Sequence, residues 1–262
     1  LAMVGVDYIF HLAALKHVPV CEENTWEAVL TNIYGTQNII ECAIENKVKK
    51  VVDISTDKAV DPFNHYGVTK ACAEKMIVNA SFNYFCSTKF VCIRGGNVLG
   101  TNGSVIPLFK SQIVKTNEIT ITDPKMTRYL MSKSDAIGLV FEAVEKSIGG
   151  EIFVMRMPAT SVEIMANSMI ELFGDANTCV KIIGSRPGEK VDEVLVSKNE
   201  APFTKVVNEK YYVILPQKPS DELTARYRVS EVIDTEEFNS RNADQLTTSD
   251  LTLQLKNQAW LM

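Results

Sequence analysis

Hydrophobic and polar positions along the chain follow two alternating patterns. Short runs rich in β-branched residues, typical of buried strands, are separated by longer segments in which apolar residues recur at helical spacing. This alternation predicts βαβ units around a parallel sheet, and therefore an α/β fold. In order along the chain, we expect a strand at residues 6–12, a helix at 25–45, a strand at 50–54, a helix at 66–79, a strand at 89–94 and a helix near 105–115.

The second half of the chain is less regular and predicts a second, smaller α/β lobe. We expect strands at residues 119–121 and from residue 151 (EIFVM), and helices near 135–146 and at 162–173. Two of these helices follow capping-box patterns, Ser132-Lys-Ser-Asp135 and Thr160-Ser-Val-Glu163. Residues after 216 are polar and weakly periodic, which favours a wrapping tail over a core element. The expected organisation is a first domain at residues 1–117, a lobe at 118–216 interleaved with it, and a tail at 217–262.

Composition limits the kinds of partner. The chain has 262 residues, 46% of them hydrophobic, which is enough for a substantial core. Its net charge of -5, without a long run of like charges, argues against a nucleic-acid surface or a membrane-binding basic helix. No apolar run approaches the roughly 18 residues that span a bilayer. Six scattered cysteines without a C-x-x-C motif are typical of reduced thiols, so we expect a globular, cytoplasmic protein.

One motif pairs a tyrosine with a lysine. Tyr66 and Lys70 are four residues apart, which places both on one face of the predicted helix. The ammonium is expected to lower the pKa of the phenol, and the tyrosine can then remove a hydroxyl proton while hydride leaves the same carbon for a nicotinamide. The lysine can also hold the ribose of that cofactor. Because Y-x-x-x-K also occurs on solvated helix faces, the motif alone leaves that alternative open.

A second motif, Asp57-Lys58, directly follows the predicted strand VVDIS. The carboxyl ends of parallel strands are where ligands gather, so this position favours a pocket shared with Tyr66 and Lys70. A solvated ion pair is the alternative interpretation of Asp57 and Lys58. The two motifs together favour an active site.

The glycines do not follow the dinucleotide-binding pattern. Such a fold opens with a strand, a glycine-rich turn and a helix that holds the pyrophosphate, whereas this sequence starts on a strand like the fourth one. Gly95, Gly96, Gly100 and Gly103 lie between a predicted strand and helix, but not at G-x-G-x-x-G spacing, and we interpret them as a substrate-contacting loop. Whether the chain is a fragment or a natural short form stays open, and a short form is expected to bind the dinucleotide weakly.

Taken together, the sequence resembles the extended short-chain dehydrogenase/reductases that modify nucleotide sugars, and within them the inverting UDP-N-acetylglucosamine 4,6-dehydratases. The resemblance runs in family order to about residue 196 and implies a Rossmann-like parallel sheet, N-terminally incomplete, with a smaller C-terminal α/β substrate lobe. Six parts of the sequence carry it: HLAALKHVP (11–19), TNIYGTQN (31–38), STDKA with YGVTK (55–70), RGGNVLGTNGSVIP (94–107), ITDPKMTR (121–128), and GGEIFV with IIGSRPGEK (149–190).

The resemblance implies an NADP-dependent (or NAD-dependent) lyase. Tyr66 would deprotonate the sugar C4 hydroxyl as hydride passes to the cofactor, giving a 4-ketone that acidifies C5–H. Lys58, with its pKa lowered by the site, would take the C5 proton, while Asp57 in its acid form protonates the departing C6 hydroxyl. Return of the hydride to C6 and reprotonation of C5 from the opposite face would complete a C5-inverting 4,6-dehydration. Epimerases do not need the Asp57-Lys58 pair.

The same resemblance implies binding roles for further residues. Cofactor contacts would come from Tyr66, Lys70, Asn32 and Ala13, and substrate contacts from Lys16, Thr56, Asn97, Arg128, Arg186 and Glu189. Arg186 precedes Pro187-Gly188, which suits a tight turn that presents a guanidinium to phosphate. Capping or pairing with carboxylates is the alternative for the two arginines. His11 and His17 are interpreted as wall or core residues, and no group of residues has metal-site spacing.

Three classes of function are therefore weighed. The first is the dehydratase, acting on a UDP-sugar in polysaccharide or nonulosonate precursor synthesis. The second is a nucleotide-sugar 4-epimerase or a retaining 4,6-dehydratase. The third is a non-catalytic binding or oligomerisation module. Kinship further implies a homo-oligomer, and neither nucleic acid nor membrane is expected as a partner.

Overall fold

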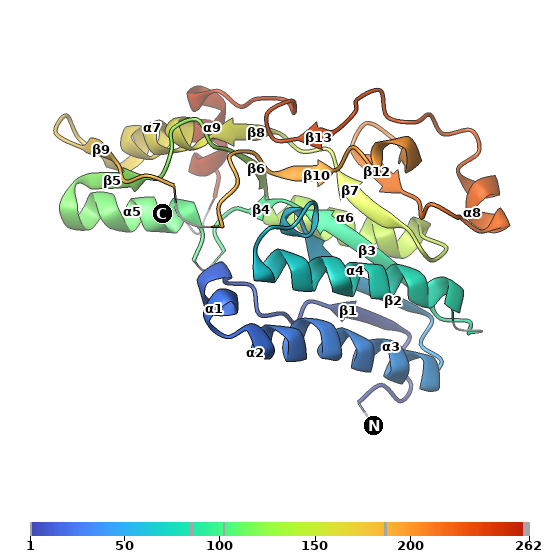
Figure 1. Cartoon of the computed structure of the whole chain (residues 1–262). Helices are drawn as coiled ribbons and strands as arrows, with labels where there is room; N and C mark the ends of the chain where they lie inside the picture. The colour runs from blue at the N-terminus through green and yellow to red at the C-terminus, as the bar shows by residue number, and fades with distance from the viewer. Residues whose placement is uncertain (1, 84–85, 102, 186–187, 259–262) are drawn as a thin grey trace. The chain divides into compact units, whose positions relative to one another are not determined.

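The computed structural model describes residues 2–83, 86–101, 103–185 and 188–258 (Figure 1). The chain divides into two compact units that are interleaved in the sequence. The first unit consists of Leu1–Gly95, Ser134–Arg156 and Val194–Phe238, and the second of Gly96–Lys133, Met157–Glu193 and Asn239–Met262.

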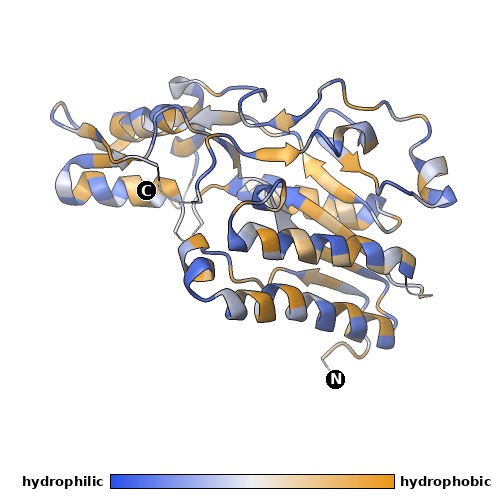
Figure 2. Ribbon diagram, in the orientation of Figure 1, coloured by the Kyte–Doolittle hydropathy of each residue, from blue (hydrophilic) through white to orange (hydrophobic). Residues whose placement is uncertain are grey.

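The first unit is built on a six-stranded sheet with the order β1-β2-β3-β7-β12-β11. The first four strands are parallel, and the last two join antiparallel. Strands β2 and β3 are buried along most of their length, as expected for parallel strands covered on both faces. Figure 2 shows β7 as a largely hydrophobic ribbon. The strands are β1 (Tyr8–His11), β2 (Lys50–Thr56), β3 (Lys89–Gly95), β7 (Ile152–Met155), β11 (Thr204–Val206) and β12 (Tyr211–Ile214); the short β10 (Val194–Val196) pairs with β13 (Phe238–Asn239).

The helices between the first three strands confirm the predicted alternation. Helix Lys133–Lys146 and strand β7, which the sequence predicted for the second lobe, belong instead to the first unit. The predicted helix at residues 25–45 is continuous but contains a five-residue π-helical stretch in its middle, η1, with Asn32 buried inside it. The helices are α1 (Val18–Glu23), α2 (Thr25–Val29), η1 (Leu30–Tyr34), α3 (Gly35–Glu45), η2 (Asp57–Ala59), α4 (His65–Asn83), α6 (Lys133–Lys146), η3 (Ala201–Phe203) and α8 (Asp221–Arg226).

Helix α4 carries the Tyr-x-x-x-Lys motif and is longer than predicted. It begins after Asn64, whose Oδ1 accepts a hydrogen bond from the Gly67 N–H at 2.8 Å. Its buried side includes Tyr66, Lys70 and Ala73, and continues to Ala80 at spacings of three and four residues. The motif therefore lies on the buried face of the helix and not on a solvated one.

The second unit has its own hydrophobic core, formed around α5, α7 and α9. Helix α7 begins as predicted at Val162, but its cap is Ser161, whose hydroxyl accepts from the Ile164 N–H at 3.1 Å, and not the predicted Thr160. The elements are β4 (Asn97–Val98), α5 (Val105–Thr116), β5 (Glu118–Ile121), β6 (Thr127–Met131), β8 (Ala159–Ser161), α7 (Val162–Phe173), β9 (Cys179–Ile182) and α9 (Thr248–Lys256).

Part of the predicted wrapping tail is a core element. Leu251 and Leu255 of α9 are fully buried in the core of the second unit, where α9 contacts α7. The helix is held by a capping box between Thr247 and Asp250. This helix is short and follows a polar segment, so it has too few apolar residues for a helical periodicity to be visible in the sequence.

Candidate active site

The Asp57-Lys58 motif lies at the carboxyl end of β2, where η2 begins. The Thr56 hydroxyl donates to Asp57 Oδ1 at 2.8 Å and accepts from the Lys58 N–H at 3.4 Å. Because β2 lies between β1 and β3 in the parallel part of the sheet, this turn lies at the carboxyl ends of the strands, where ligands of such sheets bind.

Asp57 and Lys58 form a partly buried ion pair. The distance from Lys58 Nζ to Asp57 Oδ1 is 3.1 Å. The Asp57 side chain is 1% exposed and that of Lys58 28%. Asp57 Oδ2 is buried without a hydrogen-bond partner in the structure, although a buried carboxyl oxygen is normally paired. This oxygen is therefore available to carry a proton or to bond to a ligand hydroxyl.

Gly67 allows α4 to approach this turn. A Cβ atom on Gly67 would lie 2.3 Å from the Lys58 carbonyl oxygen and 3.0 Å from Pro62 Cβ. Only glycine fits at that distance, so the residue after Tyr66 sets how closely the tyrosine approaches Asp57 and Lys58. The sequence interpretation singled out Tyr66 and Lys70 and missed Gly67; its place inside a helix, where glycine is unfavourable, was the available signal.

The electrostatics of Tyr66 differ from the simple expectation. Burial raises the pKa of its phenol above the ordinary value. The charges of Lys70 and Lys58 act in the opposite direction, the charge of Asp57 raises the pKa, and a hydrogen bond with Thr56 lowers it. The prediction that the ammonium lowers the phenol pKa is correct for the contribution of Lys70, but wrong for the net direction, because burial outweighs it.

Lys70 is buried, with Nζ 3.4 Å from Asp53 Oδ2. Asp53 is fully buried in β2, and its Oδ1 lies 3.9 Å from Nε2 of His11, the last residue of β1. Sequence reasoning placed His11 correctly among the core or wall residues, but did not single out Asp53. A lone Asp within a hydrophobic strand was the available signal.

The expected cofactor-side residues lie around the loop that follows β1. Asn32 Oδ1 accepts from the Leu15 N–H at 2.7 Å, and its Nδ2 donates to the Leu15 carbonyl and to Thr69 Oγ1, both at 3.0 Å. Asn32 thus fixes the loop that presents Ala13 and Lys16, which are both exposed. An exposed loop at the carboxyl end of a parallel strand, beside a buried Tyr and Lys, fits the nicotinamide end of a dinucleotide.

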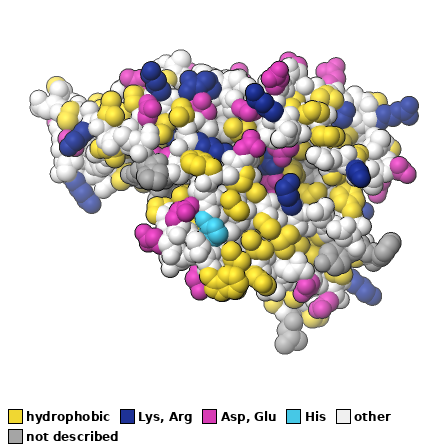
Figure 3. All heavy atoms as spheres, in the orientation of Figure 1, with side chains coloured by type: hydrophobic (Ala, Val, Ile, Leu, Met, Phe, Trp, Pro, Cys, Tyr) yellow, Lys and Arg dark blue, Asp and Glu magenta, His cyan; other side chains and the backbone are white. Residues whose placement is uncertain are grey.

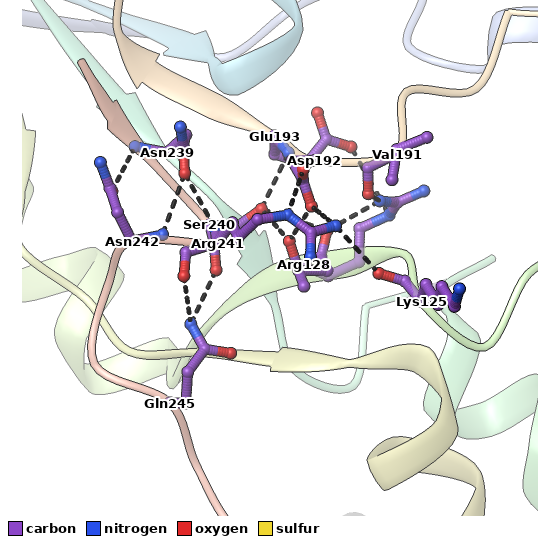
Figure 4. Close-up of polar contacts among 11 residues, drawn as sticks. Lys125, Arg128, Val191, Asp192, Glu193, Asn239, Ser240, Arg241, Asn242 and Gln245 are labelled. Atoms are coloured by element: carbon purple, nitrogen blue, oxygen red, sulfur yellow. Dashed lines mark hydrogen bonds and ion pairs between the residues drawn. The ribbon is translucent and has the colours of Figure 1, made fainter. Parts of the chain in front are cut away.

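The remaining expected substrate residues belong to the second unit, except Arg186, which lies outside the described residues. Asn97 is half-buried in β4, and Glu189 is half-buried. The Arg128 guanidinium donates to the carbonyls of Thr127 and Val191 at 2.7 and 3.1 Å, and its Nε is 3.6 Å from Glu193 Oε1 (Figure 4).

The contact with Glu193 corresponds to the carboxylate pairing that the sequence left open as an alternative role of Arg128. The contacts of Arg128 are part of a larger polar cluster. Figure 4 shows the neighbouring Asp192 carboxylate held by Arg241, with bonds of 2.8 and 3.0 Å. Asp192 Oδ1 also accepts from the Thr127 hydroxyl at 2.6 Å. The segment before β10 is therefore tied to β6 and to the C-terminal part of the chain.

Several other features of the described residues bear on function. The described residues contain no group of three His, Cys, Asp or Glu side chains placed to hold a metal ion. Within the same residues, no helix has the length and apolar character needed to cross a membrane. All six cysteines are free thiols.

Comparison with known proteins gives relatives along almost the whole chain. The UDP-glucose 4-epimerase of Rickettsia felis is 42% identical over 260 residues, which cover 98% of this chain and 75% of that protein. The X-ray structure of Pen from Bacillus thuringiensis is 40% identical, with a TM-score of 0.88 over 98% of this chain and 77% of that one.

More distant solved structures show the same fold. MoeE5 in complex with UDP-glucose and NAD has a TM-score of 0.65 at 22% identity, over 71% of this chain and 69% of that one. DesIV, a dTDP-glucose 4,6-dehydratase from Streptomyces venezuelae with NAD and TYD bound, has a TM-score of 0.65 at 21% identity, over 72% and 64%.

The fold is thus the Rossmann-like α/β fold, with a parallel-rich central sheet, of the short-chain dehydrogenase/reductases that modify nucleotide sugars. Within this class, the chain belongs to the family described as polysaccharide biosynthesis protein, which its residues 1–216 match.

Proposed function

We propose that this protein is a C5-inverting UDP-N-acetylglucosamine 4,6-dehydratase that forms a UDP-4-keto-6-deoxy-N-acetylhexosamine. The observation that supports this proposal is the Asp57-Lys58 pair, 3.1 Å apart and close enough to Tyr66 for both charges to act on its phenol. Elimination of water needs an acid and a base beside the group that oxidises the sugar. Transfer of hydride to and from C4, as in an epimerase, needs no such acid and base for elimination.

The cofactor in this proposal is NADP, or NAD as in the complexes of the distant structural neighbours. When bound, it supplies a hydride acceptor and later a hydride donor. Tyr66 and Lys70 would hold its nicotinamide ribose, and the loop fixed by Asn32, with Ala13, would hold the adjoining part. The two remaining donors of the Lys70 ammonium suit ribose hydroxyls, since one is directed at Asp53.

Each protein group would move one proton. Tyr66 takes the proton of the sugar C4 hydroxyl, and Lys58 takes the proton at C5. Asp57 gives its proton to the C6 hydroxyl, which leaves as water. Tyr66 then gives the proton it took from the C4 hydroxyl to C5 on the opposite face of the ring, as hydride arrives at C6. These steps remove one water molecule and leave the sugar with no net oxidation.

The short distance between Lys58 and Asp57 allows the pair to exchange the proton that elimination requires. Before elimination, the single proton of the pair must lie on Asp57 with Lys58 neutral; afterwards Lys58 is charged and Asp57 anionic, as in the ion pair seen here. Both forms have the same number of protons, so a shift across 3.1 Å interconverts them. The cycle returns Tyr66 to its starting form and leaves one extra proton on Lys58 and one fewer on Asp57, which the shift of one proton across their contact restores.

The UDP group carries negative charge, and a protein of net charge -5 needs placed cations to bind it. We assign this role to Lys16, Arg128 and Arg186. Thr56 and Asn97 would contact the sugar, and Glu189 would accept from ribose or uracil donors. For Arg128, diphosphate binding would compete with its contact to Glu193.

A second candidate is a nucleotide-sugar 4-epimerase, and the observation in its favour is the name of the Rickettsia felis relative, UDP-glucose 4-epimerase. Incubation of the full-length protein with UDP-N-acetylglucosamine in deuterated water separates the candidates. A dehydratase gives a product without the C6 hydroxyl and with deuterium at C5, visible by NMR. Conversion of a UDP-sugar to its C4 epimer without C5 exchange would replace our proposal with the epimerase.

The same experiment addresses the remaining alternatives. Retention or inversion at C5 is read from the proton couplings of the 4-keto product, and retention would point to the retaining dehydratase. A non-catalytic module would give no product at all. Calorimetry with NADP then decides, since micromolar binding contradicts the non-catalytic module.

Lys58→Ala tests the assigned base. We expect elimination to be abolished, by at least about 100-fold, because general acid–base groups contribute about 10²–10⁴-fold. UDP-sugar binding, measured by calorimetry, should stay within about threefold of the wild type. Lys75→Ala, an exposed lysine on α4, is the matched control and should change neither. Equal losses of binding and turnover would instead make Lys58 a structural or phosphate-binding residue.

The expected homo-oligomer stays a prediction. It is supported by exposed apolar side chains on α2 and η1, namely Trp26, Leu30 and Tyr34, together with Phe63 and Val68 near the start of α4. Figure 3 shows hydrophobic atoms gathered where these helices of the first unit lie. Such a surface is typical of an interface between proteins.

A further inference from the structure

Three side chains from neighbouring strands form a row beneath α4. His11 of β1 is the register partner of Asp53 in β2, and Asp53 is the register partner of Cys92 in β3. Paired residues of adjacent strands point to the same face of a sheet, so the row is set by strand pairing. All three side chains are buried, and Asp53 at its centre is fully buried.

Lys70 lies over this row, with its ammonium 3.4 Å from Asp53 Oδ2. The lysine side chain is 4% exposed and that of Asp53 0%. A buried ammonium is strongly disfavoured unless a partner of opposite charge compensates for the lost hydration. The partner must therefore be found among the carboxylates that face Lys70.

The other nearby carboxylates are already paired, since Lys58 binds Asp57 and Arg94 binds Glu74. Arg94 of β3 donates to Glu74 twice, from Nε to Oε2 at 2.9 Å and from Nη2 to Oε1 at 2.5 Å. The same guanidinium also binds Glu200 at 2.7 and 2.9 Å. Asp53 is thus the carboxylate left for Lys70.

His11 bonds to Thr36, and its Nε2 is 3.9 Å from Asp53 Oδ1. Its Nε2 lies 3.3 Å from Thr36 Oγ1, and the Thr36 hydroxyl itself donates to the Asn32 carbonyl at 2.8 Å. Thr36 therefore accepts a hydrogen bond from the Nε2–H of His11. Burial lowers the pKa of His11; the Asp53 charge opposes this shift and the Lys70 charge adds to it.

We propose that Asp53 is a positioning residue that keeps the Lys70 ammonium charged and directed, so that Lys70 can act on Tyr66 and on the cofactor ribose. This inference rests on the proposed function only for the use to which the charged lysine is put. The proximity of Asp53 to Lys70 is seen directly in the structure. Asp53 lies outside the six parts of the sequence that carry the family resemblance.

The charged and titratable groups around Lys70 come from every element that contacts it. The charge of Lys70 acts on His11 of β1, Asp53 of β2, Tyr66 of α4 and Cys92 of β3. The next groups outward are Asp57 and Lys58 of η2, which act on Tyr66, and Glu74 of α4 and Arg94 of β3, which act on Cys92. Burial raises the pKa of the Asp53 carboxyl, against the opposing charges of Lys70 and His11. Burial and the neighbouring charges therefore have opposite effects on the ionised pair, and removal of either charge should change the protonation of the other group.

The direct test is a titration of Lys70 by NMR of lysine labelled with ¹³C at Cε. Lys70→Met identifies the resonance. We expect the titration midpoint of Lys70 to move in Asp53→Asn to a pH at least about one unit lower than in the wild type, because an uncompensated buried ammonium loses its proton more readily. Asp7→Asn, which removes the partner of exposed Lys49, is the control and should leave the Lys70 midpoint unchanged. An unchanged midpoint in Asp53→Asn would overturn the inference.

A second measurement avoids dependence on the folding of the variant. The ¹³Cγ shift of Asp53 in the wild-type protein at neutral pH reports whether its carboxyl is ionised. We expect the ionised form, and a protonated Asp53 at neutral pH would contradict the proposed pair.

Activity adds an independent result. If the protein forms product, the alkaline limb of its kcat profile should move to lower pH in Asp53→Asn, whereas a purely structural defect would lower kcat equally at every pH. Product formation with an unmoved limb would contradict the role of Asp53. The absence of any product would contradict the proposed function instead, and would leave the NMR result to decide on Asp53.

Discussion

Gly67→Ala is the substitution for which the structure makes the sharpest prediction. The added methyl group would lie 2.3 Å from the Lys58 carbonyl oxygen, whereas ordinary contacts begin at 3.4 Å. The neighbouring atom belongs to the backbone, so it cannot move aside as a flexible side chain would. Helix α4 and η2 must therefore separate by about 1 Å, and a misplacement of about 1 Å can cost about 100-fold in rate.

The same substitution has a favourable effect that must be weighed against the clash. In a helix interior, Ala is about 0.8–1.0 kcal/mol more favourable than Gly. Overpacking of a tight site costs about 1–3 kcal/mol. We therefore expect a net loss of stability of about 0–2 kcal/mol, together with a much larger loss of catalysis, because Tyr66 moves away from Asp57 and Lys58.

Gly138→Ala is the matched control, since its Cβ would meet nothing closer than Tyr211 Oη at 3.6 Å and the residue lies inside α6. Both variants are compared with the wild type by urea unfolding and by kcat for the 4-keto product. The control should be as stable as the wild type or more so, with unchanged kcat. A Gly67→Ala protein with kcat within about threefold of the wild type would refute the proposed close approach as a requirement for catalysis.

Two further predictions concern stability. Leu251→Ala, in the buried side of α9, should lower the free energy of unfolding by about 2.7–5.0 kcal/mol, measured by urea denaturation. Leu253→Ala, 63% exposed on the same helix, should change it by less than about 0.5 kcal/mol; similar losses would mean that α9 is not a core element. For His11, burial lowers the pKa from 6.5, so below about that pH the unfolded chain binds more protons and the free energy of unfolding should fall as pH falls. His11→Asn should weaken this dependence and His17→Gln should not; equal slopes in the wild type and His11→Asn would contradict the assignment.

Periodicity predicted the elements that are long or strongly apolar. Strands β1, β2 and β3, and helices α4 and α7, lie where β-branched runs and helical spacing placed them. The patterns of β2, β3 and α7 reflect burial, which a single sequence records directly, whereas β1 is an edge strand with Tyr8 and Phe10 exposed. The position of Asp57 and Lys58 at the end of β2 followed from the same reasoning.

Short elements were missed because their formation depends on pairing partners far along the chain. Strand β8 has three residues, and it forms because it pairs with β6. Helix α9 owes its place to contacts with α7, which is distant in sequence. In such elements, tertiary contacts outweigh local preference.

The amino-acid sequence by itself determined the α/β alternation, the helix that carries Tyr66 and Lys70, and the identity of the groups able to exchange protons. Only the tertiary structure decided how these groups affect one another. Burial raises the pKa of Tyr66, strand register places Asp53 beneath Lys70, and Gly67 admits the Lys58 backbone. The physical reason is that charge interactions and steric fit depend on distance and on exclusion of water, and both are set by segments that meet only in the folded chain.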